Sequence, residues 1–143
     1  AGIRLLYRGE AIADGFLATV APDGGPRVHP VCPIVADDTL WVFVVNLSPK
    51  YRDLLRNGRY AIHSMPTAEG GEEFYLRGTA QAVDDEDTRR AVTAATNGVL
   101  GHNDFEALFR FEIDTAMYTI WHGWGTADMM PRYHKWHRQR QSQ

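Results

Sequence analysis

The chain has 143 residues, of which 44% are hydrophobic and 11% aromatic, a composition typical of one folded domain and not of a disordered segment. Its formal net charge of -3 argues against a general nucleic-acid-binding protein, which usually carries a basic face. Cys32 is the single cysteine, which excludes an intrachain disulfide and favours a reducing, cytoplasmic location.

No apolar run approaches the roughly 20 residues of a membrane span, and the chain opens without a signal-peptide pattern. The sequence therefore predicts one cytoplasmic domain over residues 1–143, with neither a membrane nor a nucleic acid as partner. Because the sequence does not begin with Met, an extension before Ala1 stays open.

The first part of the chain is predicted to form strands joined by turns. Residues 16–21 are rich in strand-forming side chains, and the turn sequence PDGG follows them. A second extended run, residues 27–35, contains Pro30 and Pro33, which cannot donate ladder hydrogen bonds. Either this run is an edge strand protected by its prolines, or its free backbone groups face a flat ligand.

Residues 40–45 (LWVFVV) are apolar on both faces, as expected of a strand that is covered on both sides. A short helix should follow, because Ser48 is a good N-cap and Pro49 suits the first helical position. The pair Asn57-Gly58 should end this helix.

The second part of the chain adds strands at residues 59–65 and 73–83, and Gly78 predicts a bulge or bend in the longer one. Acidic residues followed by alanines predict a capped helix over residues 84–97. The remaining expected elements are strands at residues 108–114 and 116–121, and a tail or docking helix at residues 126–143. About six antiparallel strands with two small helices indicate a barrel or a sandwich.

Lys50 is not explained by the helix in which it lies. A cation in the first turn opposes the positive end of the helix dipole, but it becomes favourable when an anion binds there. Ser48, Lys50 and the free backbone N–H groups could then hold the anion together, and Arg27 and His29, which share one strand face, could meet it from another side. From these residues alone, a plain capped helix and a phosphate site both remain open.

Three stretches in this order, FLATVAPDGGPRVHPVCPIV, LWVFVVNLSPKYRDLLRNGRYAIHSM and EFYLRGTAQAV, resemble the flavin-binding split-barrel proteins related to pyridoxamine 5'-phosphate oxidase. The likeness spans residues 14–84. It implies a mainly β fold, a six-stranded antiparallel split β-barrel with a few short helices. It also implies a homodimer with FMN at the subunit interface, and an FMN-dependent oxidoreductase acting on an unidentified small-molecule substrate.

The resemblance also implies which residues contact the cofactor, and it favours the phosphate site over the plain cap. Ser48 and Lys50 match the family's phosphate-binding helix start, and Arg27 matches a second-strand arginine that approaches the same phosphate. Contacts with the ring and the ribityl chain are expected from two strands, at Val28, His29, Pro30, Val44, Val45 and Asn46.

The sequence departs from the family pattern at several positions. Pro49 stands where many relatives have Arg or another polar residue, and the family's glutamine near the fifth strand is not visible. Cys32 lies near the place where true pyridoxamine phosphate oxidases carry a lysine for the substrate phosphate, which argues against authentic vitamin B6 oxidation. His29 could donate to the ring or could simply be a wall residue.

The aromatic and histidine-rich end of the chain leaves other ligands open. We expect Trp124 to be the aromatic residue nearest the cofactor, covering the partner subunit's flavin pocket or filling the dimer interface. His134 and His137 would share one face of a helix, which keeps haem open, but no carboxylate or cysteine completes a metal site and none is predicted. The alternatives are a deazaflavin-coenzyme-dependent reductase, a non-enzymatic flavin- or haem-binding protein, and a dimeric barrel without a cofactor.

Overall fold

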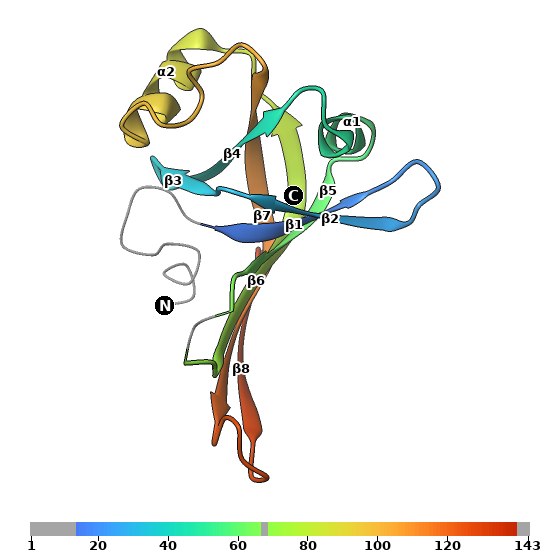
Figure 1. Cartoon of the computed structure of the whole chain (residues 1–143), viewed down its shortest axis with the longest axis vertical. Helices are drawn as coiled ribbons and strands as arrows, with labels where there is room; N and C mark the ends of the chain where they lie inside the picture. The colour runs from blue at the N-terminus through green and yellow to red at the C-terminus, as the bar shows by residue number, and fades with distance from the viewer. Residues whose placement is uncertain (1–13, 67–68, 140–143) are drawn as a thin grey trace.

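The computed structural model describes residues 14–66 and 69–139 as a mainly β structure with two helices (Figure 1). The helices are α1 (Pro49–Arg56) and α2 (Glu86–Ala95). The strands are β1 (Gly15–Val20), β2 (Pro26–Val31), β3 (Ile34–Ala36), β4 (Thr39–Val45), β5 (Arg59–Ser64), β6 (Glu72–Ala82), β7 (Glu106–His122) and β8 (Met130–His137). No helix in the part of the chain that the structure describes is long and apolar enough to cross a membrane.

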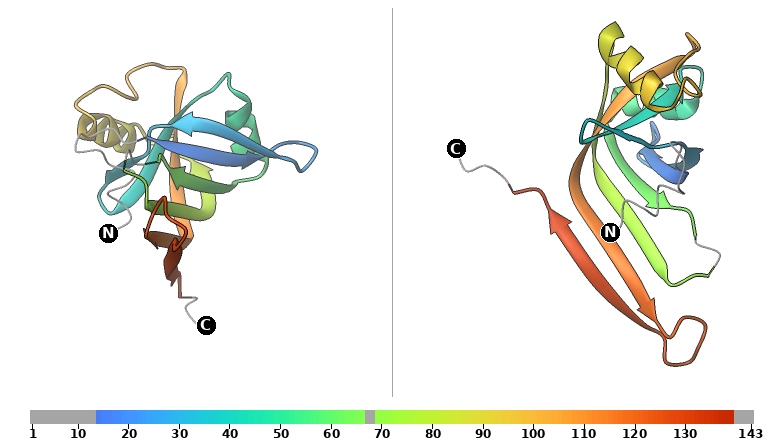
Figure 2. Two further views of the ribbon diagram at one scale, coloured as in Figure 1. Left: turned by 60° about the horizontal axis from the view of Figure 1, so that its bottom comes forward. Right: turned by 90° about the vertical axis from the view of Figure 1, so that its left-hand side faces the viewer.

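All strands belong to one antiparallel sheet in the order β2-β1-β5-β6-β7-β4-β3, and β8 pairs with β7 outside this path. The sheet curls into a half-barrel, and the hairpin of β7 and β8 extends away from it (Figure 2). β2 and β3 are the two ends of the order, so the barrel is split there. The predicted split β-barrel is confirmed, with eight strands in the sheet where six were expected.

Two strand predictions differ from the structure. The run 27–35 forms two strands, β2 and β3, because Pro33 lies between them and has no N–H to offer a ladder. The segments 108–114 and 116–121 form one strand, β7, because β6 pairs with it from Phe109 to Ile120 and keeps it extended.

The predicted bulge at Gly78 is confirmed. The pairing of β6 with β7 shifts register between Arg77 and Gly78. A Cβ at Gly78 would lie 1.8 Å from the carbonyl oxygen of Glu112, so the two backbones approach more closely there than any side chain would allow.

The prediction of a helix or loose tail at residues 126–143 is wrong for its central part, because β8 is a strand; residues 140–143 lie outside the described residues. The cause is an open edge on the neighbouring strand. β4 pairs with β7 only as far as Phe111, which leaves Thr115 to His122 free to bind β8. Arg138 closes the gap between the two partners, since its backbone N–H and Nε donate to the carbonyls of Asp114 and Ile113.

The core lies inside the curled sheet. Its fully buried side chains include Leu17, Val42, Val44, Ile62 and Phe109, which come from four different strands and from the inward-facing positions of each. The helix α1 adds Leu54 to this core, and α2 covers a smaller cluster around Trp41 through Val92. This packing holds α1 against β1, β4 and β6.

Candidate anion and cofactor site

The start of α1 leaves its backbone donors without a negative partner. Ser48 is the N-cap: its Oγ donates to the carbonyl of Val45 over 2.6 Å and accepts from the N–H of Tyr51 over 3.4 Å. Pro49 occupies the first turn, and this turn contains no acidic residue. The positive end of the helix is therefore not neutralised by the helix itself, and it favours an anion.

Three basic side chains from two elements gather beside this helix start. Burial lowers the pKa of Lys50. The pKa of His29 is also lowered, first by burial and then by the positive charges of Lys50 and Arg27, although Asp53 acts in the opposite direction. The charges of Lys50 and Arg27 therefore lie within electrostatic range of the His29 ring.

Two buried nitrogen atoms in this cluster have no hydrogen-bond partner among the described residues. They are Nε2 of His29 and Nε of Arg27, and the second of these lies in an ion pair with Asp53, 3.0 Å from Oδ2, without the alignment of a hydrogen bond. Both side chains project from the same face of β2, since they are two residues apart in a strand. Buried polar atoms are normally satisfied. A phosphate group would supply acceptor oxygens and negative charge together, so the residues present fit the phosphate end of a cofactor such as FMN.

Arg27 is not free, because it pairs with a carboxylate that the sequence analysis missed. Its Nε lies 3.0 Å from Oδ2 of Asp53, whose side chain is only 1% exposed. The same carboxylate accepts from Thr19 Oγ1 over 2.8 Å and from Arg56 Nη2 over 2.8 Å. The available signal was Asp53 itself, a charged residue next to the apolar Leu54 of the predicted helix. The sequence did not indicate its partners Arg27 and Thr19, which lie 26 and 34 residues away.

The other predicted contacts fall into two groups. Val28 and Pro30 lie on the face of β2 opposite to Arg27 and His29, and Val28 is 63% exposed. At the end of β4, the side chain of Val44 is fully buried in the core, so only its backbone can contact a ligand. Val45 is exposed, and Asn46 donates its backbone N–H to the carbonyl of Phe105.

A sequence model of the family described as Pyridoxamine 5'-phosphate oxidase matches residues 13–142. The chain belongs to this family. The match extends the likeness well beyond the first strands and covers the hairpin of β7 and β8. A comparison with curated proteins finds no match.

Solved structures with the same fold include proteins of different kinds. A haem-binding protein from Mycobacterium smegmatis superposes with a TM-score of 0.69 at 17% identity, over 94% of this chain and 55% of that one. PhzG from Burkholderia lata, solved with tetrahydrophenazine-1-carboxylic acid, gives 0.65 at 18% identity, over 88% and 76%. HutZ, the haem storage protein from Vibrio cholerae, gives 0.63 at 17% identity, over 78% and 87%. At these identities the likeness establishes the fold alone, and the chain spans only about half of the Mycobacterium protein.

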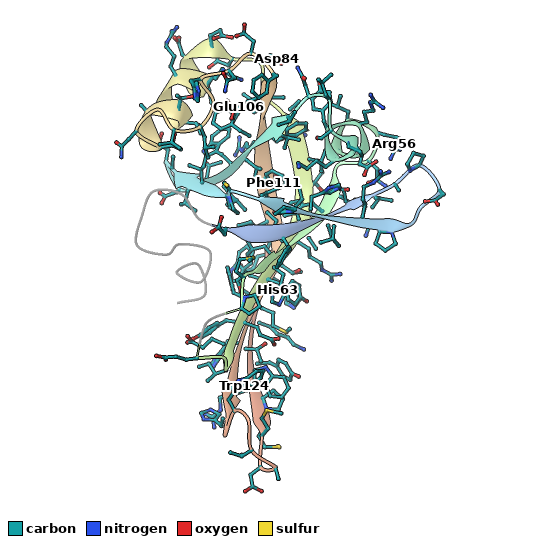
Figure 3. The ribbon with its side chains drawn as sticks, viewed as in Figure 1. Arg56, His63, Asp84, Glu106, Phe111 and Trp124 are labelled. Atoms are coloured by element: carbon teal, nitrogen blue, oxygen red, sulfur yellow. The ribbon has the colours of Figure 1, made fainter. Side chains whose placement is uncertain are left out.

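Trp124 lies far from the anion cluster within one chain. It sits in the loop between β7 and β8, at the opposite end of the molecule from the labelled Arg56 of α1 (Figure 3). Its indole packs against Trp121, with ring centroids 6.0 Å apart, and lies directly on Gly70. Trp124 is therefore not placed beside the predicted phosphate contacts of its own chain.

The tail histidines do not share one face, as they would in a helix. His134 and His137 lie in β8, where an odd spacing places them on opposite faces of the strand. His134 instead stacks on Tyr118, with ring centroids 6.0 Å apart. No group of His, Cys, Asp and Glu that could hold a metal ion occurs among residues 14–66 and 69–139.

The outer face of the sheet carries a continuous row of mostly apolar side chains. The pairing registers place them side by side across β2, β1, β5, β6, β7 and β8, in the order Pro30, Phe16, His63, Tyr75, Met117 and Lys135. A shallow cavity of about 200 Å³ opens on this face between Phe16, Val28 and Tyr75. Such a face is the kind of surface that a partner protein covers.

Proposed function

We propose that the protein binds FMN and acts as an FMN-dependent oxidoreductase on a small molecule. One observation carries this proposal: the unpartnered Nε2 of His29 and the cations Arg27 and Lys50 lie beside the start of α1, whose first turn holds no acidic residue. This set matches the needs of a phosphate dianion, and the family match makes a flavin phosphate the natural candidate.

Each residue has a defined task in this proposal. Lys50 and Arg27 supply positive charge to the phosphate. Ser48 caps α1 and so fixes the position of its first turn. The edge of β2 that does not face β1 offers backbone groups to a flat ring, because Pro30 and its neighbours pair on one side only. FMN, when bound, would supply the redox chemistry through its ring, while the protein would position the ring and exclude water.

The visible absorption spectrum of the purified protein tests the proposal. We expect flavin bands that remain after excess FMN has been added and the unbound fraction removed. A protein that ignores FMN but binds a deazaflavin coenzyme would keep the anion site and change the cofactor. If the protein binds neither cofactor, the phosphate site is wrong and Ser48 is only the N-cap of α1.

A homodimer with the cofactor at its interface is part of the proposal. The row from Phe16 to Met117 on the outer face is the surface that would be covered by the second copy, and Trp124 of the partner subunit would then approach the cofactor. Sedimentation velocity should detect a dimer that Tyr75→Glu dissociates. The matched control is Leu55→Glu on α1, which also places a charge at an exposed apolar position and should leave the dimer intact.

Haem binding is the second candidate, because two of the similar solved structures are named for haem. His63 is the histidine best placed for it, since it lies in the middle of the outer-face row and is exposed. Titration with haemin should then give a Soret band that His63→Ala abolishes and His102→Ala, on a distant loop, does not. A Soret band that survives His63→Ala would remove this assignment.

A further inference from the structure

Asp53 is a buried carboxylate behind the anion cluster, and three elements contact it. Thr19 of β1 and Arg56 of α1 each donate to it over 2.8 Å, and Arg27 of β2 lies 3.0 Å away. A carboxylate with 1% exposure has lost nearly all of its hydration, which costs several kcal/mol before any partner is counted.

Stability alone does not require a carboxylate at this position. Buried ion pairs can often be replaced by apolar side chains without loss of stability. α1 is already anchored to the core by Leu54, which is 3% exposed, and by Tyr51, whose ring meets Phe109 edge-on at 5.9 Å. The docking of α1 therefore has apolar anchors besides Asp53, whose carboxylate contacts polar partners only.

The charge of Asp53 is maintained at neutral pH. Burial would raise the pKa of its carboxyl, but hydrogen bonds from Arg56 and Thr19 and the positive charges of Arg27 and Arg56 outweigh burial and hold the pKa below the usual range. A permanent negative charge therefore faces the guanidinium of Arg27.

The geometry of this pair fixes one edge of the Arg27 guanidinium and leaves the other open. Nε lies 3.0 Å from Oδ2, and Nη2 donates to Oδ1 over 3.5 Å. The side chain of Arg27 is 35% exposed, and both contacts with Asp53 use the edge formed by Nε and Nη2, so Nη1 lies on the other edge. In the pairing register Arg27 lies opposite Thr19, which binds the same carboxylate, so strand pairing and side-chain contacts agree.

We propose that Asp53 is a positioning residue for the phosphate of the cofactor: it holds Arg27 by one edge so that Nη1 is directed to the anion beside Lys50. This inference rests on the proposed function. It assigns the FMN affinity of the site partly to a residue that never touches the ligand.

A double-mutant cycle tests it. FMN and riboflavin differ only in the phosphate, so the ratio of their affinities isolates phosphate binding. We expect Arg27→Ala and Asp53→Asn each to lower this ratio about tenfold, as loss of a charge-assisted hydrogen bond does, and the double variant to be no worse than Arg27→Ala. If Asp53→Asn lowers the ratio equally in the Arg27→Ala background, Asp53 does not act through Arg27 and the inference is wrong.

A second pair of variants covers the case in which Asp53→Asn does not fold. Arg27→Lys keeps the charge but loses the fork that binds Asp53 and the anion together, so its ratio should fall close to that of Arg27→Ala. The matched control is Arg56→Lys. Arg56 also donates to the Asp53 carboxylate, and it donates to the carbonyl of Val20 as well. An unchanged ratio in Arg27→Lys, or an equal loss in Arg56→Lys, would overturn the inference.

Failure of the inference and failure of the proposed function give different results. If the wild-type protein binds riboflavin as tightly as FMN, the phosphate site itself is wrong. If the wild-type protein prefers FMN and Asp53→Asn retains that preference, the site is right and Asp53 is only structural.

Discussion

Replacing Lys50 with methionine removes one positive charge at the start of α1 and keeps an unbranched side chain of similar length. Lys50 is partly buried, and burial lowers its pKa, so its ammonium group is in surroundings less polar than water. Two unit charges 4 Å apart interact by about 4 kcal/mol at an effective dielectric constant of about 20. Part of this is offset by desolvation, which leaves about 2 kcal/mol for a hydrogen bond to a charged group. The dissociation constant for FMN should therefore rise about 30-fold.

Isothermal titration with FMN and with riboflavin measures this effect directly. The affinity for riboflavin should change less than about threefold, and the loss for FMN should shrink at high salt because screening weakens the wild-type contact. The control is Arg52→Met, which removes the same charge from an exposed position on the same helix and should weaken FMN less than about threefold. Equal losses for FMN in the two variants, or for FMN and riboflavin in Lys50→Met, would refute the placement of the phosphate.

Three further outcomes can be measured on the free protein or by simple titration. Gly78→Ala should reduce the free energy of unfolding in urea by at least about 3 kcal/mol, because the new Cβ would lie 1.8 Å from a backbone oxygen. The control is Gly25→Ala, whose new Cβ would approach only the flexible Asp23 carboxylate, and it should reduce the same free energy by less than about 1 kcal/mol. Phe109→Ala should cost about 4 kcal/mol as a fully buried ring is lost, and the half-exposed Phe105→Ala about 0.5 kcal/mol; similar values for the two would contradict the core assignment. In NMR titrations the pKa of His29 should lie below 6.5 in the free protein, so the fold should lose stability as the pH falls below 6.5. Adding FMN should raise the pKa of His29, whereas adding riboflavin should not. If FMN leaves this pKa unchanged, His29 does not lie beside the phosphate.

Much of the fold was predictable because it depends on local patterns. The apolar run 40–45 is β4, the acidic-then-alanine run 84–97 contains α2, and the Ser48-Pro49 pair begins α1. These signals come from periodicity and capping, which need no knowledge of distant residues.

The end of the chain was not predictable in the same way. β8 has exposed residues on both faces, so it shows neither the alternation of a half-buried strand nor an apolar run. It is a strand only because β7 offers an unpaired edge, and that edge exists because β4 stops at Phe111.

The candidate site was likewise predictable only in part. Ser48 and Lys50 are two residues apart, and Arg27 and His29 share a strand face, so the sequence could group each pair. The link between Arg27 and Asp53 depends on α1 docking on β1 and β2, and nothing local to either residue indicates it. Val44 shows the reverse case, because a position chosen from the resemblance has a side chain committed to the core.

The strand β7 has different neighbours along its two halves, and this has a consequence for how the molecule opens. One edge of β7 is bound to β6 along most of its length, while the other edge is bound first by β4 and then by β8. Amides of Thr115 to His122 that donate to β8 are protected only by the hairpin, whereas those that donate to β6 are protected by the barrel. Hydrogen exchange along this single strand would therefore alternate residue by residue between a low and a high opening free energy. Adjacent amides of β7 thus report two different stabilities, that of the β7–β8 hairpin and that of the barrel.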